Sequence, residues 1–92
     1  MPRFLIEVPH EAKVGDCARA ADTFIRTGSH FLTRAEWGCM DGDHKAWLIV
    51  ELSNKEEARN VIPPVFRSHA KIVELNTFTL AQVEELKRHH EA

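Results

Sequence analysis

A chain of 92 residues fits one domain with a modest core, because chains of this size bury only about 60–65% of their unfolded surface. Hydrophobic residues make up 43% and charged residues 28%, which is typical of a soluble globular protein. The net charge of −2 provides no positive field that would attract nucleic acid or anionic lipid. No run approaches the ~20 apolar residues of a membrane span, and the N-terminus lacks a signal-peptide pattern. We therefore expect a cytoplasmic protein without membrane or nucleic-acid partners.

The first two elements are predicted to be a strand and a helix. The strand covers residues 4–8, where a short apolar run stops at Pro9. Apolar residues at helical spacing then predict a helix that Gly28 ends; they are Val14, Cys17, Ala21, Phe24 and Ile25. Two cysteines, Cys17 and Cys39, are too few for a disulfide framework, so we expect free thiols in a reducing setting. Cys17 would then pack as a small hydrophobic residue.

Residues 30–53 are predicted to form a long hairpin. Asp41-Gly42 is typical of a two-residue primed turn. In that register Cys39 faces His44, Trp37 faces Ala46, and the pairing continues outward through residues 31–36 and 47–52.

Two capping boxes predict the remaining helices. Ser53 and Glu56 open a helix that Pro63-Pro64 ends, and a fourth strand covers residues 71–77. Thr79 and Gln82 open a polar tail helix over about residues 79–91.

The order of elements is strand, helix, strand, strand, helix, strand, followed by the tail helix. This is the split βαβ pattern of the ferredoxin-like α+β fold (βαββαβ), with a four-stranded antiparallel sheet and both crossover helices on one face. Over residues 3–78 the topology resembles the dimeric α/β-barrel proteins, which include muconolactone-isomerase-like enzymes and small cofactor-free monooxygenases. The resemblance implies a single-domain homodimer that binds a small organic molecule beside the sheet, and an isomerase or monooxygenase type of activity. Residues 37–47 match no catalytic motif of that family, so whether the chain is an enzyme stays open.

One sheet face is predicted to be open and apolar. Val73 and Leu75 are expected on the helix-covered side, with Glu7, Glu51 and Glu74 on the open side. The apolar residues expected on the open side form a patch larger than monomeric proteins usually expose. Such a patch usually marks an interface, so we expect a second copy of the chain to cover it. The tail helix is the alternative cover. The expected dimer-interface residues are Leu5, Leu32, Arg34, Trp47, Ile49, Ile72 and Phe78.

One sheet edge is predicted to gather a polar cluster from distant segments. Its members are His10, Cys39, His44 and His69, with Trp37 beside them as a further ligand-binding candidate. Imidazole and thiolate ligands suit zinc, copper or nickel, although the spacing matches no standard zinc motif. The pattern leaves three readings open: a divalent-metal site, the mouth of a small-molecule cavity, or a packed cysteine with solvated histidines in a purely structural dimer without a cofactor.

Overall fold

The computed structural model describes residues 1–13, 15–27 and 29–90. Within them the chain is α+β, with a four-stranded antiparallel sheet and four α-helices. The strands are β1 (Arg3–Pro9), β2 (Glu36–Trp37), β3 (Lys45–Glu51) and β4 (Lys71–Leu75), in the order β2-β3-β1-β4. The helices are α1 (Asp16–Thr27), α2 (His30–Thr33), α3 (Lys55–Val61) and α4 (Leu80–His90). This arrangement is compatible with the predicted ferredoxin-like fold.

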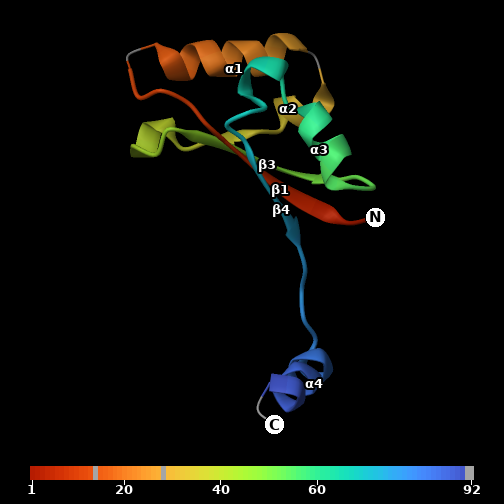
Figure 1. Cartoon of the computed structure of the whole chain (residues 1–92). Coiled ribbons are helices and arrows are strands. Elements are labelled where there is room, and N and C mark those ends of the chain that lie inside the picture. Colours follow the sequence, from red (N-terminus) through yellow and green to blue (C-terminus); the bar gives the residue numbers. More distant parts are fainter. Residues whose placement is uncertain (14, 28, 91–92) are drawn as a thin grey trace.

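Helices α1, α2 and α3 lie on one side of the sheet, and α4 lies apart from it (Figure 1). Alternate strand residues point toward the three helices, as the period of two in a β-strand requires. The buried core consists of Phe4, Ile6, Val8, Ala46, Leu48, Val50 and Ile72 from the strands, with Phe24, Leu32, Ala58 and Ile62 from the helical side. Three expectations lie outside the described residues: Val14 in the first helix, Gly28 as its end, and residue 91 in the tail helix.

The predicted long hairpin is wrong in its first half. Residues 30–33 form the short helix α2 instead of a strand, and β2 is reduced to Glu36–Trp37. The helical turn buries Leu32, at 1% exposed, in the core, whereas a strand would have pointed it at the open face. The inner part of the register is confirmed, since Trp37 pairs with Ala46 and Glu36 with Trp47.

The predicted two-residue turn is also wrong. The connection from β2 to β3 contains a 3₁₀ turn, η1 (Cys39–Asp41), and Gly42 adopts a left-handed conformation with φ of 86°. Gly38 anchors the loop: its N–H donates to the Lys45 carbonyl, and its carbonyl accepts from the N–H of Asp43. A Cβ on Gly38 would lie 2.7 Å from the Asp43 carbonyl oxygen, so this position requires glycine. Cys39 therefore sits in a turn and has no ladder partner.

The predicted faces of β4 are reversed. Ile72 pairs with Ile6 on the covered side and is 8% exposed, while Val73 pairs with Leu5 on the open side. The expectation placed Ile72 on the open face and Val73 on the covered one. A shift of one residue in a strand exchanges its two faces, so the one-residue error in register assigned every residue of β4 to the wrong face.

The caps of the two later helices follow the expected chemistry. Thr79 and Gln82 form the predicted reciprocal capping box, with N–H to side-chain oxygen distances of 2.8 and 3.2 Å. In α3 the cap lies one residue later than predicted: Asn54 accepts from the N–H of Glu57, and the N–H of Ser53 donates back to Glu57. No helix among the described residues has the length and apolarity to cross a membrane.

Candidate functional site

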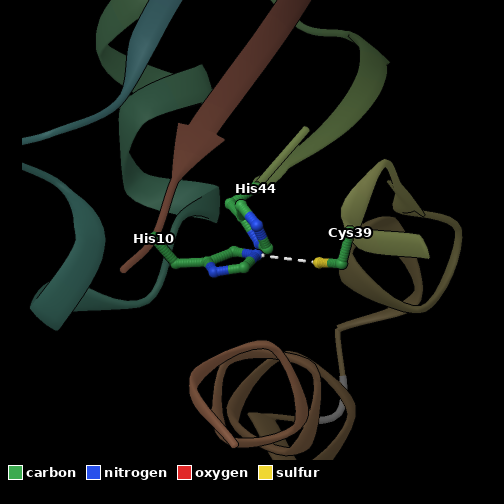
Figure 2. Close-up of side chains that lie close together, drawn as sticks. All are labelled: His10, Cys39 and His44. Atoms are coloured by element: carbon green, nitrogen blue, oxygen red, sulfur yellow. Dashed lines mark hydrogen bonds between the residues drawn. The ribbon is translucent and has the colours of Figure 1, made fainter. Parts of the chain in front are cut away.

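Two histidines meet where β1 ends and β3 begins. The antiparallel ladder pairs Pro9 with Lys45, and the next step brings the N–H of His10 to 3.1 Å from the His44 carbonyl. The turn η1 carries Cys39 to the same place. One ligand atom from each of His10, Cys39 and His44 lies within 4.8 Å of the others, and all three residues are half-buried (Figure 2). The predicted gathering of these three residues is thus present, although Cys39 arrives through the turn and not through strand pairing.

The orientation of the His10 ring is fixed by a backbone carbonyl. Its Nδ1 lies 3.0 Å from the carbonyl oxygen of Glu11, which can only accept, so Nδ1 carries the proton and donates. In the neutral ring Nε2 is then left with a free lone pair. Nε2 lies 3.0 Å from Sγ of Cys39. A histidine held in this way presents one nitrogen as a ligand, which is the usual arrangement around protein-bound metals.

His44 contributes a nitrogen with no partner. Its Nδ1 is buried and makes no hydrogen bond. The ring meets that of His10 edge-on, with centroids 5.7 Å apart and planes at 76°. A buried polar atom without a partner costs free energy, so a group that uses its lone pair or proton is needed at this position.

Cys39 is also bonded to Cys17. The structure joins their sulfur atoms in a disulfide between η1 and the first turn of α1. The expectation of two free thiols was therefore wrong. Sequence reasoning assigned Cys17 to hydrophobic packing and missed its place beside the cluster. The available signal was the even number of cysteines, one near the predicted sheet edge and one in the helix that follows β1.

An aromatic wall supports the cluster from the core side. Phe24 of α1 packs edge-on against Trp37 with ring centroids 5.0 Å apart, and Trp37 lies 5.9 Å from the ring of His10. Trp37 is half-buried between these rings. It thus lies beside the histidines as expected, and its closest aromatic partner belongs to the core.

A cavity of about 670 Å³ adjoins the cluster and shares His10 with it. Its polar lining includes Asp16 and Arg19, which form an ion pair, and His69. His69 is exposed and contributes no ligand atom to the cluster of His10, Cys39 and His44. Unlike these three candidates, it therefore lines the cavity without being part of the cluster. The remaining lining residues are Pro9, Glu11, Ala12, Ala20, Thr23, Val65 and Phe66.

Comparison of the chain with protein families, curated proteins and solved structures gives no match. The function is therefore inferred from the chemistry of the site.

Proposed function

We propose that this protein binds a divalent transition-metal ion of the zinc class through His10, Cys39 and His44. The convergence of three ligand atoms within 4.8 Å of one another, from segments up to 34 positions apart, carries the proposal. Two imidazoles and a thiolate suit zinc, and also nickel or copper.

The spacing supports a tetrahedral ion. Zinc binds nitrogen at about 2.0–2.1 Å and sulfur at about 2.3 Å, so neighbouring ligand atoms lie about 3.3–3.8 Å apart. The observed ligand atoms lie within 4.8 Å of one another, about 1 Å beyond the upper end of that range, so binding requires the side chains to draw closer around the ion. The hydrogen bond from His10 to Glu11 and the unpartnered Nδ1 of His44 both favour ligation.

The test is a zinc titration of the reduced protein, comparing wild type with His44→Ala and with His69→Ala. Wild type and His69→Ala should bind one ion per chain and show a raised melting temperature, because a ligand of the folded state stabilises it by mass action. His44→Ala should bind zinc at least about 100-fold more weakly. Removing a residue that only hydrogen-bonds to a metal ligand already lowers metal affinity by about 10–100-fold, and His44 is itself a ligand. An equal response of both variants would rule out the site.

A small-molecule function is the second candidate, and the adjoining cavity favours it. A volume of about 670 Å³ is within the range of small-molecule sites. Arg19, although paired with Asp16, keeps further N–H donors, and together with His69 it can hydrogen-bond the carboxylate of a small organic ligand. This use of the cavity would agree with the resemblance to cofactor-free isomerases and monooxygenases. Binding of small carboxylates that is lost in His69→Ala but kept in His44→Ala would separate it from metal binding.

We also propose a ferredoxin-like homodimer in which the open sheet face and α4 meet a second copy. All residues from Asn76 to His90 are exposed, including apolar Leu80, Val83 and Leu86 on α4. A lone helix of 11 residues is marginal in water, so it needs a partner surface. The open face offers Ile49 and Val73, which are 58% and 37% exposed, beside half-buried Leu5 and Trp47. Arg34 lies outside the strands but lines a shallow hollow on this face with Leu5, Trp47 and Ile49.

The exposed area supports a second copy as the cover. The chain exposes 6662 Å², whereas a compact monomer of this mass exposes about 5,400 Å². The excess is larger than the roughly 800 Å² that each partner of a standard interface buries. The radius of gyration of 16.5 Å likewise exceeds the roughly 12 Å of a compact chain of this length.

Ile49→Glu is expected to convert a wild-type dimer to monomers at micromolar concentration, because the cost of desolvating a carboxylate in the interface exceeds what an ion pair with the nearby Arg34 returns. Ile49 is a cleaner target than Trp47, whose Nε1 donates to Glu7 at 3.1 Å, so that a glutamate there would also repel Glu7. Ile25→Glu is the matched control, since Ile25 is 63% exposed on α1, across the sheet from the open face. Sedimentation provides the measurement, and a monomeric wild type would contradict the proposal.

A further inference from the structure

We infer that metal binding and the Cys17–Cys39 disulfide are alternative states of one site, and that Cys17 is the fourth ligand of the metal in the reduced protein. The site would be Cys₂His₂ when reduced and would release its ion when the two cysteines are oxidised. This inference rests on the proposed metal-binding function and adds its regulation.

The two states exclude each other because they use the same atom. Sγ of Cys39 is a member of the ligand cluster and is also bonded to Sγ of Cys17. A cysteine binds zinc as a thiolate, whereas a disulfide sulfur carries no negative charge. Oxidation therefore removes the anionic part of the site and leaves two neutral imidazoles, which form a far weaker site for zinc.

Cys17 is placed to complete the coordination. Its sulfur is bonded to that of Cys39 and hence lies beside the cluster, on the first turn of α1. Closed tetrahedral zinc sites take four protein ligands, and His10, Cys39 and His44 provide three. The Cα atoms of the two cysteines are 6.6 Å apart, near the long end of the disulfide range of about 4.4–6.8 Å. At this distance the two backbones leave room for two separate thiolate ligands once the S–S bond is reduced.

In the oxidised structure each of the two histidines has a ring nitrogen without a hydrogen-bond donor or acceptor that matches it. Nε2 of His10 faces Sγ of Cys39 at 3.0 Å, but a disulfide sulfur has no hydrogen to donate to its lone pair. Nδ1 of His44 is buried without a partner. A metal ion between the four residues would take lone pairs from both rings and from both thiolates. The polar groups of the site are thus better satisfied in the reduced, metal-bound state.

The conversion balances with a peroxide as the oxidant. Two zinc-bound thiolates give up two electrons to one hydrogen peroxide and form the S–S bond. The peroxide O–O bond breaks, two protons are taken up, two waters form, and Zn²⁺ is released. In the reverse direction a dithiol reductant supplies two electrons and two protons to the disulfide, and the two protons leave as Zn²⁺ binds the thiolates.

The test starts from reduced protein loaded with one equivalent of zinc without oxygen. Stoichiometric hydrogen peroxide should release one zinc ion per two thiols lost, measured with a chromogenic chelator and a thiol reagent. The oxidised protein should bind zinc at least about 100-fold more weakly than the reduced protein. If both forms bind zinc equally well, the redox coupling is wrong while the proposed function stands. If neither form binds zinc, the proposed function itself is wrong.

The role of Cys17 has its own readout. In the reduced, cobalt(II)-loaded protein, the thiolate-to-metal charge-transfer absorption should fall by about half in Cys17→Ser and likewise in Cys39→Ser, because each variant keeps one of the two thiolates, and it should disappear in the double variant. His69→Ala, which changes a neighbouring histidine outside the cluster, should leave the spectrum unchanged. A Cys17→Ser protein with the wild-type spectrum and zinc affinity would show that Cys17 is not a ligand.

Discussion

Phe24→Ala is expected to lower the free energy of unfolding by about 3–5 kcal/mol, the cost of removing a buried phenylalanine and leaving a cavity. The side chain is 1% exposed and belongs to the buried core cluster. Its ring centroid is 5.0 Å from that of Trp37 and 5.7 Å from that of Phe66, both edge-on. The loss would be a large part of the 5–15 kcal/mol that stabilises a typical domain.

Ile25→Ala is the matched control, because Ile25 is the next residue on α1 and is 63% exposed. Its substitution should change stability by less than about 0.5 kcal/mol, as is usual at exposed positions. Urea unfolding followed by Trp fluorescence measures both variants. Similar losses in the two proteins would mean that α1 does not present Phe24 to the core.

Reduction of the metal-free protein is expected to lower the free energy of unfolding by about 3 kcal/mol. The disulfide closes a loop between residues 22 positions apart, and in the chain-entropy account a loop of this size restricts the unfolded chain by about that amount. Urea unfolding with and without a dithiol reductant, in the presence of a chelator, measures the difference.

Cys17→Ser should reproduce the stability of the reduced protein and should not respond to the reductant. Adding zinc should stabilise reduced wild type but not the oxidised protein, because only the former has free thiolates. If reduction leaves the stability of metal-free wild type unchanged, the disulfide does not form in solution. The redox coupling inferred for the site would then be wrong, whereas the proposal of metal binding by the reduced protein would be unaffected.

Local chemistry in the sequence was enough for several elements. The alternation Phe4, Ile6, Val8 requires one buried face for β1, and the structure buries all three. The Thr79–Gln82 capping box starts α4 where it was predicted, because the bonds that cap a helix involve residues only three apart. The pairing of Trp37 with Ala46 also followed from the sequence, although the turn that was used to derive it has a different shape.

The faces of the later elements depended on long-range packing. Leu32 and Ile72 are apolar residues in short segments that fit either a covered or an open position by pattern alone. The structure buries Leu32 by winding residues 30–33 into α2, and it buries Ile72 by pairing it with Ile6. A strand of five residues such as β4 has too few alternations to fix its register by itself, so the neighbouring β1 decides it.

The site shows the same division between sequence and tertiary structure. The sequence determined that His10, Cys39 and His44 come from segments that end at one sheet edge, and the structure brings one ligand atom of each within 4.8 Å. Only the tertiary structure decided that His69 lies in the cavity beside them and that Cys17 is bonded to Cys39. The position of Cys17 depends on how α1 packs across the sheet through Phe24, and a contact of that kind is set by the whole core and not by the residues near either cysteine.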